Sequence, residues 1–220
     1  MTDYARDNKR GENAAAPNCF KVIVAGEKGC GKSSFFNRVS QGIFEDNYNP
    51  TIAAGFAKVL YQYNGREVYL YLWDTSGEEK FQATTKMYYK DTNLALLMFD
   101  ISNKESFVKV PLWLDYICDN VPEEALIYLI AAKTDLEEDV SMKEVDNFIA
   151  KKNSGPKIVI HKKAYISSKT GDGIEELLNA AVYNLLDEEK KRDELGQVPK
   201  RVSYKIVPEK KKVAKKGCNC

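Results

Sequence analysis

Residues 26–33, GEKGCGKS, match the phosphate-binding template GxxxxGK[ST] and lie between a predicted strand and a predicted helix. The strand covers residues 19–25, which are mainly apolar and β-branched, and helical spacing begins at Ser34. Successive backbone N–H groups of a glycine-rich loop form an anion-binding concavity, and the helix start adds its positive dipole end. Here Lys32 is placed to reach the terminal phosphates, and the Ser33 hydroxyl can bind Mg²⁺. The sequence therefore predicts a nucleotide-phosphate site; a glycine turn used only for tight packing is the alternative.

The strand pattern predicts one mainly parallel sheet. Its expected strands are residues 19–25, 56–63, 66–73, 94–99, 126–132 and 163–166. Asn64-Gly65 joins the second and third runs, and this dipeptide between alternating apolar runs is a strong hairpin signal, so this pair is antiparallel. The fourth and fifth runs are nearly continuously apolar, as in strands buried on both faces of a parallel sheet.

Helical segments alternate with these strands. One follows the phosphate loop, one lies between the third and fourth strands, and three more are expected over residues 106–120, 141–152 and 173–189. Pro111 interrupts the first of these three, so we expect a helix that is kinked or restarted there. The alternation predicts an α/β fold, a P-loop NTPase-type three-layer sandwich with a six-stranded mainly parallel sheet, one antiparallel strand and five helices.

Composition and charge divide the 220 residues into a domain with two tails. Residues 1–18 are expected to be a disordered leader, 19–189 one globular domain, and 190–220 a flexible basic tail. Residues 200–220 carry eight Lys or Arg against one acid; because the whole chain carries +1, the other residues carry −6. An acidic body argues against nucleic acid as a partner, whereas a basic tail favours an anionic surface.

Two absences lead us to expect that the protein is made and kept inside the cell. No apolar run approaches the roughly 20 residues that a membrane helix needs, and the N-terminus lacks a signal-peptide core. Five cysteines, scattered except at the C-terminus, are expected to be reduced thiols and not a disulfide framework.

Four further motifs follow the phosphate loop in a characteristic order. They are Pro50-Thr51-Ile52, Trp73-Asp74-Thr75-Ser76-Gly77, Lys133-Thr134-Asp135 and Ser167-Ser168-Lys169. Each alone is uninformative, but the ordered set resembles the guanine-nucleotide motifs of Ras-superfamily small GTPases. Tyr88-Tyr89-Lys90, residues 80–85 and Cys218-Asn219-Cys220 are similar to the Rab family specifically. The resemblance covers about residues 19–187 and the tail, and implies a GTP-binding switch with GTPase activity that regulates vesicle trafficking.

The resemblance assigns roles at the phosphate end. Thr51 resembles the switch threonine that meets Mg²⁺ and senses the terminal phosphate, and Asp74 suits an outer-shell carboxylate near that ion. The Gly77 N–H has room beside a phosphate. The expected phosphate-loop residues are Gly26, Lys28, Gly29, Cys30, Gly31, Lys32, Ser33 and Ser34. The expected metal residues are Ser33, Thr51 and Asp74, and the expected catalytic residues are Glu78, Thr51 and Lys32.

The resemblance also assigns the base end. A carboxylate at Asp135 would accept from guanine N1–H and the amino group, a pair of donors that adenine lacks. Lys133 would lay its methylenes along the base, and the Ser168 N–H would donate to the guanine oxygen, supported by Ser167 and Lys169. Phe44 occupies the position of a stacking aromatic, with core packing as the alternative.

Three positions depart from the family pattern. Ala132 replaces an asparagine that contacts the base and ties the phosphate loop down, so weaker binding and faster exchange are expected. Glu78 replaces the catalytic glutamine; an ionised Glu only accepts hydrogen bonds, whereas Gln also donates, so slow hydrolysis is expected. Lys28 stands where relatives often have a small residue, and would pair with Glu78, touch the terminal phosphate or point at water.

The C-terminus carries a predicted lipid anchor. Cys218 and Cys220, beyond a run of lysines, are similar to the Cys-x-Cys ending on which Rab proteins carry two geranylgeranyl groups. A zinc-ligand pair is the rival interpretation. The anchor implies the cytoplasmic face of an intracellular membrane, with cycling to the cytosol.

The resemblance implies a monomer that binds GTP or GDP with Mg²⁺ and recruits effectors through residues 42–57 and 74–90. Its other implied partners are an exchange factor, a GTPase-activating protein, and prenylation and membrane-extraction factors. The alternative is a non-cycling pseudo-GTPase interaction module with weak or constitutive nucleotide binding, favoured by Ala132 and Glu78. A small P-loop kinase does not account for the Asp135 and Ser168 motifs.

Overall fold

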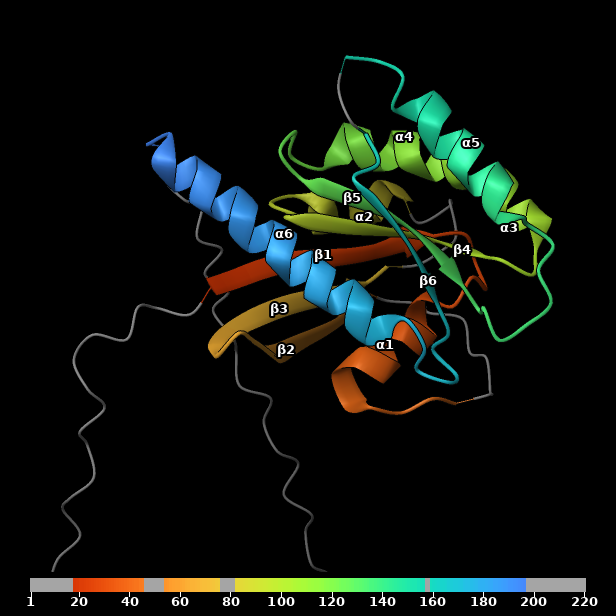
Figure 1. Ribbon diagram of the computed structural model, residues 1–220, viewed down its shortest axis with the longest axis horizontal. Coiled ribbons are helices and arrows are strands. Elements are labelled where there is room, and N and C mark those ends of the chain that lie inside the picture. The colour runs from red at the N-terminus through yellow and green to blue at the C-terminus, as the bar shows by residue number, and fades with distance from the viewer. Residues whose placement is uncertain (1–17, 46–53, 76–81, 157–158, 197–220) are drawn as a thin grey trace, which may run out of the picture.

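The computed structural model describes residues 18–45, 54–75, 82–156 and 159–196. Its strands are β1 (Asn18–Gly26), β2 (Gly55–Tyr63), β3 (Arg66–Asp74), β4 (Leu94–Asp100), β5 (Leu126–Ala132) and β6 (Lys162–Ile166). Its helices are α1 (Lys32–Gln41), α2 (Gln82–Tyr89), α3 (Lys104–Val108), α4 (Val110–Asn120), α5 (Met142–Lys152) and α6 (Ile174–Glu194). Figure 1 shows their arrangement.

The predicted fold class is confirmed: the elements form one six-stranded sheet in the order β2-β3-β1-β4-β5-β6. Only the β2–β3 pair is antiparallel, and the other neighbouring pairs are parallel. The hairpin turns at Asn64-Gly65, both with positive φ (49° and 74°), the backbone that a two-residue type I′ turn requires.

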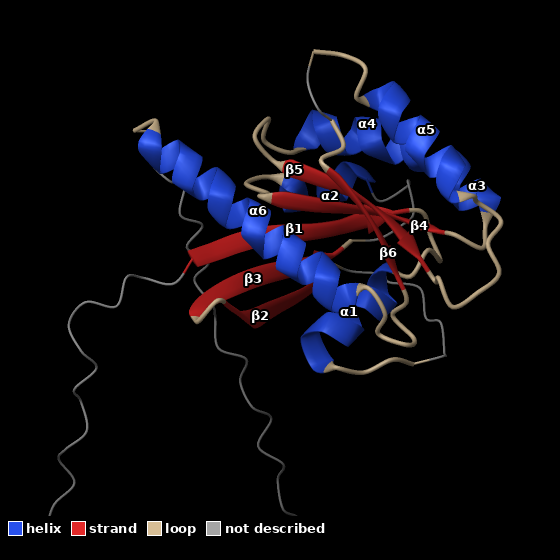
Figure 2. Ribbon diagram, viewed as in Figure 1, coloured by secondary structure: helices blue, strands red, loops and turns tan. Residues whose placement is uncertain are grey.

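Helices cover both faces of the sheet (Figure 2). Along β1, Val22 and Val24 point into a cluster with α1 and α6, whereas Ile23 and Ala25 point into a second cluster with α4 and α5. Strands packed on both faces require apolar residues at every position, which is why β4 and β5 are buried along their whole length. The three layers follow directly from this pattern.

The helices differ from the prediction in two details. The segment expected over residues 106–120 is two helices, because Lys109 separates α3 from α4 and Pro111 lies in the first turn of α4. Asn103 caps α3 by accepting hydrogen bonds from the Glu105 and Ser106 N–H groups, so this helix begins before residue 106. The described helical segments therefore correspond to the five predicted helices, one of them divided.

The last helix is longer than predicted. α6 continues to Glu194, past the expected end at residue 189, and ion pairs of Lys191 with Asp187 and Glu188 support its last turns. Its first part covers the sheet and its far end projects beyond it (Figure 1). None of the helices in the described part of the chain is long and apolar enough to cross a membrane.

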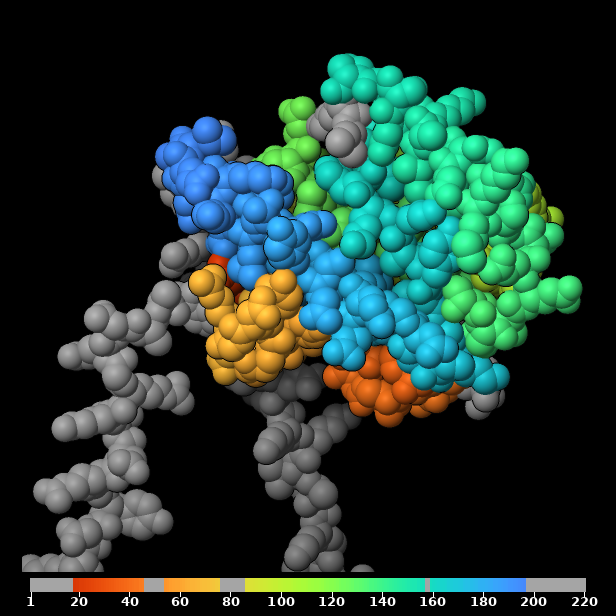
Figure 3. Space-filling view, viewed as in Figure 1, coloured from red at the N-terminus to blue at the C-terminus, as the bar shows by residue number. Residues whose placement is uncertain are grey.

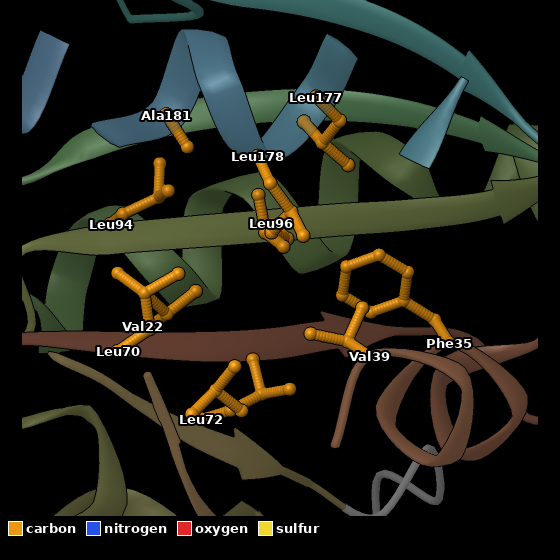
Figure 4. Close-up of a pocket in the computed structure, with 11 residues that line it drawn as sticks. Val22, Phe35, Val39, Leu70, Leu72, Leu94, Leu96, Leu177, Leu178 and Ala181 are labelled. Carbon is orange, nitrogen blue, oxygen red and sulfur yellow. The ribbon is translucent and has the colours of Figure 1, made fainter. Parts of the chain in front are cut away.

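An apolar cavity of about 10 Å³ lies between α1, α6 and the sheet (Figure 4). Its walls are the side chains of Val22, Phe35, Val39, Val59, Leu70, Leu72, Leu94, Leu96, Leu177, Leu178 and Ala181. A space of this size with no polar group is a packing defect in the core, and so does not hold a nucleotide.

Candidate nucleotide site

The segments singled out in the sequence meet at one edge of the sheet, where the parallel strands have their carboxyl ends. Strand register places Val24 beside Asp74, Asp100 beside Ala132, and Ala132 beside Ile166. The loops after β1, β5 and β6 therefore emerge together, at the right of Figure 1. This edge is where open α/β sheets bind their ligands.

The phosphate loop has the backbone that its glycines allow. Gly29 and Gly31 have φ of 79° and 98°, and a Cβ at Gly26 would lie 2.1 Å from the Met98 carbonyl oxygen. Gly31 is the N-cap of α1 and supplies no capping side chain. The first N–H groups of this helix are consequently presented to the loop without a side-chain acceptor from the cap.

Lys32 is buried, with 6% of its surface exposed, and its Nζ donates to the Glu27 carbonyl oxygen at 2.8 Å. Its ammonium group is thus folded back over the loop. The Glu27 carboxylate accepts from Trp113 Nε1 at 3.3 Å and from the Lys28 N–H at 3.1 Å. Glu27 is the one acidic residue of the loop, and these hydrogen bonds hold its carboxylate. Lys32 is the buried charged side chain of the loop.

The remaining loop side chains differ in exposure. Cys30 is fully buried in the core, and burial raises the pKa of its thiol, so this residue can offer the site only its backbone. Ser33 and Ser34 lie half-buried in the first turn of α1, and Lys28 is exposed.

Asp74 ends β3 and is buried, with 3% exposed. A Cβ at Gly55 would lie 3.4 Å from both Asp74 Cβ and Phe36 Cζ, so the end of β3 packs near α1, whose first turn carries Ser33. Thr75 fixes the chain as it leaves the strand, because its N–H and hydroxyl both donate to the Val24 carbonyl. A serine hydroxyl and a carboxylate are hard oxygen donors, so these residues fit Mg²⁺.

The base-end motifs are joined to each other. The Ser167 hydroxyl donates to Asp135 Oδ1 at 2.6 Å, and Ser167 Oγ accepts from the Thr170 N–H at 3.1 Å. Ser167 is fully buried and Ser168 is 8% exposed. Two motifs 32 residues apart in the sequence thus form one hydrogen-bonded unit that fixes the Asp135 carboxylate.

Lys133 connects the two ends of the site. It adopts a left-handed backbone (φ 65°), and its Nζ pairs with Asp100 Oδ2 at 2.6 Å. Its Cε lies 3.9 Å from the position that a Cβ would take at Gly31, so its side chain passes the phosphate loop. The predicted contacts of Lys133, Asp135 and Ser168 with a base stay predictions.

Asp100 is a residue that the sequence analysis missed. Its Oδ1 accepts from the Ser102 N–H at 2.9 Å and the Ser102 hydroxyl at 2.6 Å, while Oδ2 holds Lys133. The available signal was a carboxylate ending a strand that is otherwise apolar, where burial without partners is costly.

An aromatic cluster was missed as well. Phe56, Trp73 and Tyr88 come from β2, β3 and α2, with ring centroids 4.9 Å apart for Phe56–Trp73 and 5.3 Å for Trp73–Tyr88. Phe56 is 41% exposed. The Lys21 ammonium lies 5.4 Å from the Trp73 ring, and burial lowers the pKa of Lys21 to about 8, with Asp91 opposing the shift. The signal was Phe56 facing Trp73 directly across the hairpin.

Six further predicted site residues are Phe44, which is described, and five that are not. Phe44 lies half-exposed in the segment after α1, so its stacking role stays a prediction. Other predicted site residues lie outside the described residues: Thr51, Gly77, Glu78, Cys218 and Cys220.

Known proteins resemble this chain over most of its length. Residues 21–187 match the model of the Ras family. The chain is 32% identical over 193 residues to the Ras-related protein Rab-21 of Bos taurus, an alignment that covers 87% of this chain and 81% of the relative. It is 31% identical over 169 residues to the Ras-related protein Rab-30 of Homo sapiens, covering 77% of this chain and 81% of the relative. The family match spans the phosphate loop, the Lys133–Asp135 segment and the Ser167–Lys169 segment.

Proposed function

Because the chain belongs to the Rab family of small GTPases, we propose that it is a slowly hydrolysing GTP switch of membrane trafficking. The observation that carries this proposal is the Asp135 carboxylate, fixed by Ser167 at the same sheet edge as the glycine loop and Lys32. A carboxylate held there can select guanine while the loop holds the phosphates. Occupied by GTP, the switch recruits effectors through residues 42–57 and 74–90.

Each end of the nucleotide has its own residues. Backbone N–H groups of the loop and the Lys32 ammonium bind the phosphates, and Lys133 supports both the loop and the base. Ser33 and Thr51 would hold Mg²⁺ directly, with Asp74 acting through its waters. Bound there, Mg²⁺ supplies positive charge to the β- and γ-phosphates during hydrolysis.

Glu78 sets the expected hydrolysis rate. It can accept from the attacking water but cannot donate to a phosphate oxygen, and its charge would repel the γ-phosphate by about 3 kcal/mol at ~5 Å and an effective dielectric near 20. Glu78→Gln is therefore expected to speed single-turnover GTP hydrolysis by on the order of 100-fold. Phosphate release from GTP-loaded protein measures it, with Glu79→Gln as the matched control. Equal rates for wild type and Glu78→Gln would refute the slow-switch proposal.

Ala132 sets the expected affinity. Its buried Cβ lies 3.9 Å from the Cβ position at Gly31, so an asparagine amide there would extend into the phosphate loop. Ala132→Asn is expected to slow GDP dissociation by ~10–100-fold, because a buried hydrogen bond of this kind contributes about 1–3 kcal/mol. Displacement of a fluorescent GDP analogue measures the rate. Ala132→Ser should leave the GDP dissociation rate unchanged, because its hydroxyl is too short to reach the phosphate loop. Equal rates in the wild type and both variants would contradict the role given to position 132.

The aromatic cluster supports the effector part of the proposal. Phe56, Trp73 and Tyr88 belong to the ranges 42–57 and 74–90, or directly precede the second, and their rings pack on one another. Partly exposed aromatic side chains are the common anchors of protein interfaces. An effector bound here would contact the β2–β3 hairpin and α2 at once.

The tail completes the proposal. Cys218 and Cys220 would each carry a geranylgeranyl group, attached by prenylation factors and shielded by a membrane-extraction factor. Two lipids with a polybasic segment suffice for stable anchoring to the cytoplasmic face of an intracellular membrane. An exchange factor and a GTPase-activating protein would drive the cycle.

The competing proposal is a non-cycling interaction module, which Ala132 and Glu78 favour. The nucleotide content of the purified protein separates the two. Bound GTP or GDP, released with micromolar or tighter affinity and not replaced by ATP, supports the switch. Absence of nucleotide together with millimolar GDP affinity would favour the module.

A further inference from the structure

Arg38 joins the helix of the phosphate site to the loop of the base site. It lies on α1, and its Nε donates to the Ser168 carbonyl at 2.7 Å while Nη2 donates to the Lys169 carbonyl at 2.6 Å. Its Nη1 donates to the Gly42 carbonyl at 3.2 Å, directly after the helix. Figure 3 shows the surfaces of these two segments, which are 130 residues apart in the sequence, side by side.

These contacts continue to Asp135. The Lys169 carbonyl that Arg38 holds belongs to the same peptide group as the Thr170 N–H. That N–H donates to Ser167 Oγ, and the Ser167 hydroxyl donates to Asp135 Oδ1. The chain of donors and acceptors thus runs from a guanidinium to a carboxylate, and each bond polarises the next in the same direction.

We infer that Arg38 is a positioning residue for guanine recognition. This inference rests on the proposed function, because it assumes that Asp135 reads the base. Arg38 fixes the loop that carries Ser167 and Ser168, and through Ser167 it fixes the direction of the Asp135 carboxylate. Since α1 begins at the phosphate loop, the same side chain couples phosphate binding to base recognition.

A purely structural role makes a different prediction. In the last turn of α1, an arginine also stabilises the helix end through the Gly42 carbonyl and the helix dipole. Loss of that role alone would lower the thermal stability of the protein and would weaken the binding of all nucleotides by the same factor. Loss of positioning would weaken the binding of GDP more than the binding of a nucleotide whose base lacks one of the two guanine donors.

The test compares GDP with inosine diphosphate, whose base keeps N1–H but lacks the amino group that Asp135 would accept from. Arg38→Met keeps most of the side-chain length and removes the donors. The variant is expected to bind GDP ~10–100-fold more weakly than the wild type does. Its preference for GDP over inosine diphosphate is expected to fall by about 5-fold. Competition against a fluorescent GDP analogue gives both dissociation constants, and Arg66→Met, on the exposed hairpin, is the matched control.

Two further variants keep the inference testable if Arg38→Met folds poorly. Arg38→Lys reaches only one of the two loop carbonyls and should show an intermediate preference. Ser167→Ala should reduce the preference by itself, and adding Arg38→Met to it should reduce it little further, because both act on one chain.

The outcomes are distinct. A wild-type protein without preference for GDP over ADP overturns the proposed function, and this inference with it. A wild-type protein that prefers GDP, with an unchanged preference over inosine diphosphate in Arg38→Met and Arg38→Lys, overturns the inference alone. Additive effects of Arg38→Met and Ser167→Ala would also overturn it.

Discussion

Replacement of Lys32 by methionine is expected to weaken GDP binding by ~100-fold or more. Removing one partner of a desolvated charge pair costs about 2–5 kcal/mol, and the Lys32 ammonium is buried over the loop that would hold the phosphates. Methionine keeps the length of the side chain but not the charge. The loss should therefore come from the phosphates and not from the base.

Isothermal titration with GDP and with guanosine measures this directly. Lys32→Met should lose affinity for GDP while guanosine binding stays nearly unchanged. The matched control is Lys143→Met, on the exposed start of α5, which should bind GDP like the wild type. Wild-type affinity in Lys32→Met would mean that the phosphates lie elsewhere.

The second large effect is expected at Asp135, where asparagine should change base preference from guanine toward xanthine. The carboxylate accepts two hydrogen bonds, from N1–H and the amino group of guanine. An amide can accept from N1–H and donate to the carbonyl that xanthine carries at the same carbon, but it meets the guanine amino group with a donor. A site built around one hydrogen-bonding pattern rejects the wrong one by large factors, because buried polar groups are left without partners.

Asp135→Asn should therefore bind GDP ~100-fold more weakly and xanthosine diphosphate more tightly than the wild type does. Competition assays with both diphosphates give the two ratios. Asp187→Asn, on the exposed side of α6, is the control and should keep the guanine preference. An unchanged preference in Asp135→Asn would remove the basis for calling this a guanine site.

Local patterns were sufficient for most of the fold. The hairpin at Asn64-Gly65, the buried parallel strands and the glycine loop were predicted because each depends on residues close together in the chain. Turn geometry, strand alternation and the positive φ of glycine act over a few residues, so they can be read without the fold. The helix division was predicted at Pro111 and lies at Lys109, and the extension of α6 to Glu194 was not predicted, because end positions depend on packing and ion pairs.

The base end shows where the sequence was insufficient. The sequence predicted that Asp135 and Ser167 are site residues. It did not predict the hydrogen bond between them or the pairing of Lys133 with Asp100.

By itself, then, the sequence determined the strand–loop–helix unit, the order of the motifs and the family to which they belong. Only the tertiary structure decided that Arg38 holds the Ser168–Lys169 loop, that Asp100 holds Lys133, and that an aromatic cluster spans β2, β3 and α2. These contacts join residues far apart in the chain, and their geometry is set by how the strands align at one edge of the sheet, which no short stretch of sequence encodes.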